Sequence, residues 1–188
     1  MKFYGDYVLY PVIGLLLLAT LTFTIITHYH TGRIYPLEVE TLAIPADPVT
    51  VEQGRQLVEA YHCAECHGAD LAGKRISEDL RMGKISASNL TGGKGGVQSL
   101  NSDTDWVRAI RHGIHRSGRP LLLMPSDQYF ELGNEDLAAM IAYLKQLPAV
   151  DNELPENSVG PLAQAMYSLG KLDQLIPAEK IPQGIKNR

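Results

Sequence analysis

The only two cysteines of the 188-residue chain lie in the pentad Cys63-Ala64-Glu65-Cys66-His67. Two thiols three residues apart share one helical turn, where they can add to the two vinyl groups of one porphyrin. The histidine that follows can then offer a ring nitrogen to the iron as proximal ligand. A thioredoxin-like pair would need a preceding strand, and a zinc site would need two further ligands. Because the preceding segment is predicted to be helical, the pentad predicts one covalently attached haem.

A second axial ligand is expected, because a methionine thioether raises the potential of the iron and closes it to oxygen. Met124 is the favoured candidate, since it lies in the apolar loop 119–125 and Pro125 disfavours helix at the residue before it. A histidine ligand, His112 or His115, is the alternative, and a methionine that only fills the core is another. The remaining methionines are placed less well for this role: Met1, Met82, Met140 and Met166.

Residues 7–32 contain no Asp, Glu, Lys or Arg, and the stretch 8–27 is almost entirely apolar. Twenty helical residues span about 30 Å, the thickness of a bilayer core. A cleaved signal peptide has a shorter apolar core and a small-residue cleavage site, which residues 28–33 do not offer. We therefore expect residues 1–32 to form a transmembrane signal-anchor that is not cleaved. Residues 33–48 contain three prolines and are expected to form an extended linker that lifts the domain off the membrane.

Two helices are predicted at the ends of the segment that follows. The first begins with Thr50 as the cap of a capping box and covers residues 51–61. It contains Gly54, a poor helix former, which suggests that another backbone approaches closely there. The last helix covers residues 137–147 and is expected to cross the first one near Gly54.

The middle of the chain, residues 69–101, is rich in Gly and Ser and is expected to be a loop that wraps the cofactor. A helix capped by Ser102 or Asp103 follows, and its Trp106 either contacts the porphyrin or belongs to the core. A basic cluster accompanies this helix: Arg108, Arg111, His112, His115, Arg116 and Arg119. Its members are candidates for holding haem propionates, for docking an acidic partner, or for a solvated helix face.

The net charge is −4, and the chain has no polybasic or polyacidic run, so no nucleic-acid partner is expected.

The pentad with Gly68, the segment Gly118-Arg119-Pro120-Leu121 before Met124-Pro125, and the helix 137–147 resemble class I cytochrome c of the membrane-anchored bacterial type. The segment Asn89-Leu90-Thr91 is similar to a loop of these cytochromes. The resemblance covers residues 49–150. It implies an all-α domain around one haem c, His67 and Met124 as axial ligands, and single-electron transfer. Residues 151–188 resemble extensions of the same cytochromes, and we expect an extended C-terminal strap that packs on the domain or on a partner.

These observations predict a monohaem electron carrier, not itself an enzyme, with Cys63 and Cys66 holding the haem. It is expected to be a single-pass membrane protein whose domain lies on the periplasmic side. Its partners would be membrane lipid and other subunits of a respiratory or photosynthetic complex, with no small-molecule substrate. A quinol-oxidising complex, a terminal oxidase, a reaction centre and a membrane dehydrogenase are the candidates. A haem enzyme or sensor with an open iron position, and a structural haem subunit, are the alternatives.

Overall fold

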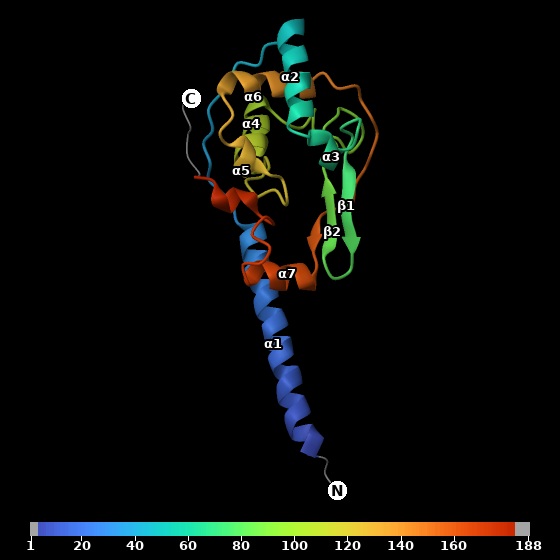
Figure 1. Ribbon diagram of the computed structural model, residues 1–188, viewed down its shortest axis with the longest axis vertical. Helices are drawn as coiled ribbons and strands as arrows, with labels where there is room; N and C mark the ends of the chain where they lie inside the picture. The colour runs from blue at the N-terminus through green and yellow to red at the C-terminus, as the bar shows by residue number, and fades with distance from the viewer. Residues whose placement is uncertain (1–3, 183–188) are drawn as a thin grey trace.

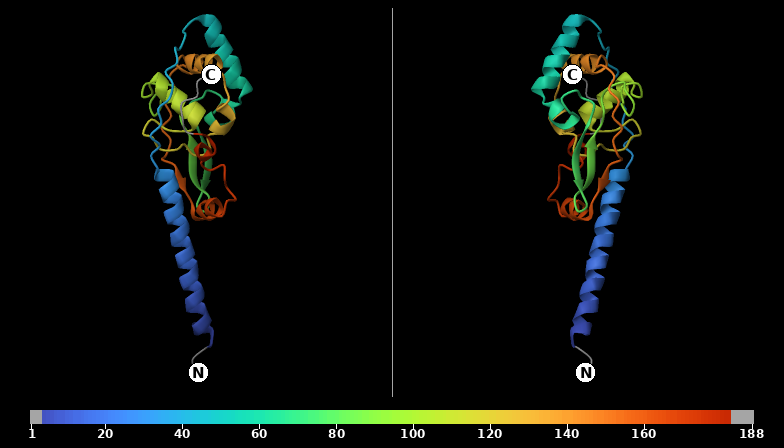
Figure 2. Two further views of the ribbon diagram at one scale, coloured as in Figure 1. Left: turned by 90° about the vertical axis from the view of Figure 1, so that its left-hand side faces the viewer. Right: turned by 90° about the vertical axis from the view of Figure 1, so that its right-hand side faces the viewer.

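The computed structural model describes residues 4–182, with side chains from residue 8 onward. A long helix, α1 (Tyr4–Gly32), projects from a small domain formed by the rest of the described chain (Figures 1 and 2). The other elements follow in this order: α2 (Pro48–Ala60), α3 (Cys63–His67), β1 (Lys74–Asp79), β2 (Gly83–Ala87), α4 (Asp103–His112), α5 (Ser126–Tyr129), α6 (Asn134–Leu144), β3 (Ser158–Val159), α7 (Pro161–Ser168) and the 3-10 helix η1 (Pro177–Lys180).

Helix α1 is long and apolar enough over Val8–Gly32 to cross a membrane, and no other helix in residues 4–182 is. Its large apolar side chains are exposed: Leu15, Leu16, Leu17 and Leu18 are each 60–66% accessible. A helix of this kind fits a membrane anchor or a signal sequence.

Helices α2 and α6 cross at Gly54, as the sequence predicts. A Cβ atom at Gly54 would overlap the backbone carbonyl of Ala139 in α6 and lie 3.0 Å from the Cβ of Tyr143. The N-terminus of α2 differs from the prediction, because Asp47 and not Thr50 is the N-cap. The Asp47 carboxylate accepts hydrogen bonds from the amides of Val49 and Thr50, at 3.2 and 3.0 Å.

The domain is mostly helical, but the expectation of an all-α fold is wrong. Strands β1, β2 and β3 form a small antiparallel sheet in that order (Figure 1). The first two strands fall within residues 69–101, whose composition predicts a loop. Most side chains of β1 are exposed, and a bulge separates Arg75 from Ser77. Strand β2 buries Ile85, which is 4% exposed, but has no second large apolar residue. The sequence therefore lacks the alternation of apolar residues that marks a half-buried strand.

The linker 33–47 is extended, but it lies along the domain and does not lift it away from α1. The Tyr35 amide donates to the carbonyl of Gly118 at 2.9 Å, and Val39, Leu42 and Ile44 pack against the main core. Glu40 forms an ion pair with Arg111 of α4, whose side chain is fully buried. Apolar side chains spaced along the linker and this ion pair hold it to the domain.

Residues 151–182 pack on the chain's own domain. Strand β3 pairs with β2, and α7 crosses α1 (Figures 1 and 2). Leu175, Ile176 and Ala178 form a second buried cluster together with Tyr35 and Ile114. Residues 151–182 are therefore a structural part of the domain.

Candidate functional site

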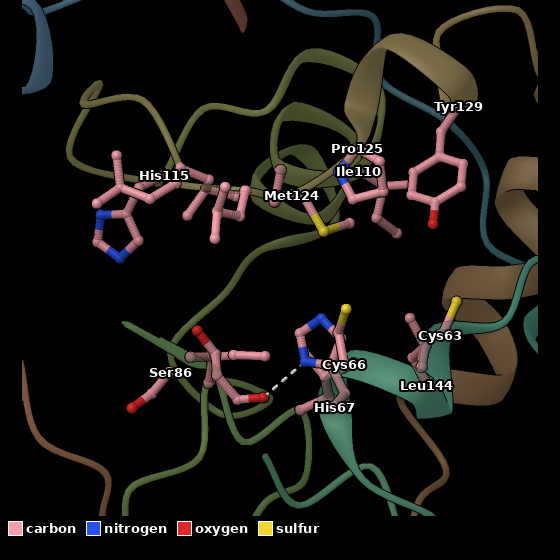
Figure 3. Close-up of a pocket in the computed structure, with 18 of the residues that line it drawn as sticks. Cys63, Cys66, His67, Ser86, Ile110, His115, Met124, Pro125, Tyr129 and Leu144 are labelled. Atoms are coloured by element: carbon pink, nitrogen blue, oxygen red, sulfur yellow. Dashed lines mark hydrogen bonds between the residues drawn. The ribbon is translucent and has the colours of Figure 1, made fainter. Parts of the chain in front are cut away.

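A deep cavity opens inside the domain between α3 and the loop that precedes α5 (Figure 3). The space in the cavity and at its mouth that no atoms fill, open solvent included, is about 1090 Å³. Its walls are mostly apolar: Leu90, Val97, Trp106, Ile110, Leu121, Leu122, Leu123, Tyr129, Met140 and Leu144. Such a cavity suits a large flat apolar ligand.

Helix α3 places both cysteines in one wall of this cavity. His62 adopts a left-handed conformation, with φ of 56°, which turns the chain from α2 into α3. Cys63 and Cys66 are both half-buried free thiols that line the cavity. Burial raises the pKa of the Cys63 thiol to about 11, so this thiol stays protonated at neutral pH. A redox-active cysteine pair would instead need a lowered pKa.

His67 is buried at the end of α3, and its orientation is fixed by one hydrogen bond. Its Nδ1 lies 2.8 Å from the carbonyl oxygen of Ser88. Because a carbonyl can only accept, Nδ1 carries the proton and Nε2 of the neutral ring is left as a donor to a metal. Burial lowers the pKa of His67, which favours this neutral form.

Met124 lies on the opposite wall, and its side chain points into the cavity toward the wall that carries His67 (Figure 3). Leu123 before it is left-handed, with φ of 58°, and its amide donates to the carbonyl of Leu175 at 3.0 Å. The Ser126 amide donates to the Met124 carbonyl at 2.7 Å. The loop is thus held by backbone contacts on both sides of the methionine.

The two alternative histidines lie elsewhere. His115 lines the cavity at the end away from the cysteines (Figure 3), where its Nδ1 lies 2.8 Å from the Ser117 hydroxyl. Burial, together with the charge of Arg116, lowers the pKa of His115. His112 is not among the lining residues and packs edge-on against Phe130. Neither histidine faces His67 across the cavity as Met124 does.

The donor set fits a haem better than a bare metal ion. Within residues 4–182 no cluster of three or more His, Cys, Asp or Glu side chains could hold a metal. One imidazole and one thioether instead face each other across an apolar space, with two thiols at its edge. Trp106, which is 2% exposed, lines the same cavity, and its Nε1 has no hydrogen-bond partner among the described residues. An indole N–H that is buried usually has a partner, and a propionate of the cofactor would supply one.

The sequence did not reveal the contacts that support this site. Ser88 acts through its backbone carbonyl, which leaves no signal in the residue type. Asn89 is 1% exposed, and its Nδ2 donates to the carbonyl of Val150 at 2.8 Å. Its Oδ1 accepts from the amide and hydroxyl of Thr91. The only sequence signal for residues 89–91 was their resemblance to a loop of the cytochrome family. These residues tie the His67 side of the cavity to the chain beyond α6.

A helical domain that closes around an apolar cavity, with a Cys-x-x-Cys-His segment in its wall, has the architecture of a haem-carrying domain. The family model for cytochrome c matches residues 51–148, which is just over half of the chain, and the chain therefore belongs to the cytochrome c family. Membership implies covalently bound haem c and a role in electron transport.

Three curated relatives are named as subunits of dehydrogenases. The chain is 30% identical over 126 residues to the gluconate 2-dehydrogenase cytochrome c subunit of Pantoea cypripedii, covering 64% of this chain and 26% of that protein. It is 33% identical over 118 residues to the fructose dehydrogenase cytochrome subunit of Gluconobacter japonicus, covering 58% and 24%. It is 30% identical over 113 residues to a subunit of nicotinate dehydrogenase from Pseudomonas putida, covering 58% and 10%. The chain thus spans about a quarter or less of each relative.

Proposed function

We propose that the chain is a membrane-anchored cytochrome c subunit that carries one haem c and passes single electrons within a redox complex. Cys63 and Cys66 would hold the haem covalently, and His67 and Met124 would bind its iron. The observation that carries this proposal is the placement of His67 and Met124 on opposite walls of one apolar cavity whose edge holds both cysteines. A second haem of this kind would need two more cysteines, and this sequence has no cysteine besides Cys63 and Cys66.

When bound, haem c supplies an iron that gains and loses one electron. The residues of the chain hold the two ligands in place and exclude water. The Ser88 carbonyl keeps the proton of His67 on Nδ1, and a hydrogen bond of this type also makes the imidazole a stronger ligand. The left-handed turn at Leu123 presents the Met124 thioether. The apolar lining lowers the local dielectric constant, which favours the iron state of lower charge and raises the potential.

Helix α1 is proposed as an uncleaved anchor that crosses the membrane once, over part of Val8–Gly32. Haem attachment to a cytochrome c takes place outside the cytoplasm, so the domain would lie on the periplasmic side. The names of the relatives favour a dehydrogenase complex among the possible partners. In that arrangement the subunit accepts electrons from a catalytic subunit and passes them to an acceptor of the membrane. This subunit would not itself convert a substrate.

The test is expression of the full chain in a host with a haem-attachment system, followed by mass spectrometry and absorption spectroscopy. We expect the mass of the polypeptide plus one haem, which stays bound on denaturation. We also expect the charge-transfer band of a methionine sulfur bound to ferric iron. Met124→Leu should abolish this band, whereas the matched control Met140→Leu, at another methionine of the cavity wall, should keep it.

A mass that matches the bare polypeptide would refute haem attachment. A band that survives in Met124→Leu would refute the ligand assignment. Absence of the band from the unaltered protein would favour an enzyme or sensor with an open iron position.

A further inference from the structure

One end of the domain, from which α1 emerges, presents an apolar surface that we call the base. It consists of Leu162 and Leu169, at the two ends of α7, and Leu80 at the tip of the β1–β2 hairpin. These side chains are 44%, 63% and 91% exposed. Figure 1 shows α7 and the hairpin tip at the same level, and the amide of Leu162 donates to the carbonyl of Arg81 at 2.9 Å. The hairpin tip and α7 therefore form one surface.

The charge pattern of the base is unusual for a surface in contact with water. Residues 157–170, which include all of α7, contain no Asp, Glu, Lys or Arg. A surface helix of a soluble domain normally has a charged outer face. Two basic side chains, Arg81 and Lys171, lie at the edges of this neutral surface. The nearby carboxylate of Asp79 is 44% exposed and accepts hydrogen bonds from the amides of Arg81 and Met82, at 2.7 and 2.9 Å. It also lies 3.7 Å from Nε of Arg81, whose side chain is 77% exposed.

The contacts between α7 and α1 set the height of the base relative to the membrane. The Thr24 hydroxyl donates to Oε1 of Gln164 in α7 at 2.8 Å, and Thr27 is only 3% exposed. A further contact holds α1 to the 3-10 helix η1, where His30 lies 2.5 Å from the carboxylate of Glu179. Since the apolar stretch 8–27 is about as long as a bilayer core is thick, α7 crosses α1 where that core ends.

We propose that the base is a lipid-binding surface that lies in the headgroup layer of the membrane. Leu80, Leu162 and Leu169 reach the boundary of the acyl chains, and Arg81 and Lys171 contact phosphate groups. This proposal rests on the membrane span of the proposed function. The domain is then fixed to the bilayer at two places, α1 and the base, and its cofactor cavity has a set height and orientation.

Thiol reactivity in lipid nanodiscs tests the proposal on the full, haem-loaded chain. Cys63 and Cys66 are consumed by the haem, so an introduced cysteine is the one free thiol. Leu80→Cys and Leu169→Cys are to be compared with the control variant Val49→Cys. Val49 is 79% exposed and lies at the start of α2, and α2 is at the far end of the domain from α7 (Figure 1). Leu17→Cys, in the middle of α1, reports the span itself.

We expect a water-soluble maleimide to react with Leu80→Cys and Leu169→Cys at least about tenfold more slowly than with Val49→Cys, because an apolar environment raises the pKa of a thiol. Leu17→Cys should be slower still. If Leu17→Cys is protected and both base positions react like Val49→Cys, the base does not bind lipid. If Leu17→Cys is also reactive, the span itself is wrong. If the unaltered chain is labelled, haem attachment has failed instead.

Photo-crosslinking distinguishes lipid from protein as the cause of protection. A benzophenone attached to the cysteine of Leu169→Cys should give a product heavier by one phospholipid after irradiation. A product heavier by a second protein chain would overturn the proposal and make the base a protein interface. A product without added mass at Leu169→Cys, in the same nanodiscs where Leu17→Cys captures lipid, would also overturn it.

Discussion

Replacing Gly54 by alanine tests whether the crossing of α2 and α6 depends on the missing side chain. The new Cβ would lie 2.6 Å from the carbonyl carbon of Ala139, about 0.8 Å inside the ordinary contact limit of 3.4 Å. The neighbouring atoms are backbone, which cannot rotate away as a flexible side chain would. Helix α6 must therefore move, together with Met140 and Leu144, which line the cavity.

The expected magnitude is the difference between two effects. Overpacking costs about 1–3 kcal/mol, and contact with backbone places this site at the upper end of that range. Alanine gains about 1 kcal/mol over glycine in helix propensity. We expect Gly54→Ala to lower the free energy of unfolding by about 2 kcal/mol, and the midpoint temperature by about 4–8 °C for a domain of roughly 150 residues.

The measurement is thermal unfolding of the haem-loaded chain in detergent, followed by far-UV circular dichroism. The control is Gly133→Ala at the N-cap of α6, where a Cβ would meet nothing within 4 Å. Gly133→Ala should lower the free energy of unfolding by less than about 1 kcal/mol. An unchanged or raised midpoint for Gly54→Ala would show that the two helices do not meet as closely as described.

Three further predictions concern the linker, the capping box that Ser102 and Asp105 form at the start of α4, and the proposed iron ligand. Glu40→Gln should lower the free energy of unfolding, measured by denaturant titration, by about 3 kcal/mol, because the fully buried Arg111 loses its ion pair. A loss under about 0.5 kcal/mol would contradict a buried ion pair. Burial raises the pKa of Asp105, but hydrogen bonds from Ser102 and the charge of Arg108 outweigh it and lower the pKa below 3.8. The stabilisation by Asp105 is therefore present above about pH 3.8 and is lost as the pH falls through the folded pKa. In an acid titration, the free energy of unfolding of Asp105→Asn should fall less steeply with decreasing pH than that of the unaltered chain. Equal slopes would contradict this prediction. Met124→His should lower the reduction potential by on the order of 100 mV, part of the roughly 0.8 V range that axial ligands cover, and redox titration showing a raised potential would count against Met124 as the ligand.

The sequence was sufficient for the elements whose signal lies in residue type and spacing. The pentad predicted the cavity wall that carries the two cysteines, and Gly54 predicted the crossing of the two helices. The proline after Met124 favoured a loop that presents the Met124 side chain. The structure places that loop opposite His67.

Other features depend on contacts that residue types do not encode. Strand β1 is largely exposed and carries a bulge, and β2 has only one large apolar side chain, the buried Ile85, so the apolar periodicity of both strands is weak. The orientation of His67 depends on the backbone carbonyl of Ser88, which any residue could supply. The packing of the linker depends on a pairing between Glu40 and Arg111 across 71 positions of sequence, and no local pattern predicts such a pairing.

The hydrogen bond from Leu123 to Leu175 has a consequence for biosynthesis. The ribosome makes the segment that contains Leu175 more than a hundred residues after the cysteine pair. The wall that carries Met124 cannot be secured until that late segment has emerged. If the domain is exported as proposed, a nascent chain would present Cys63 and Cys66 in an open cleft. Haem could then be attached at the proposed cysteines before the last part of the polypeptide closes over it.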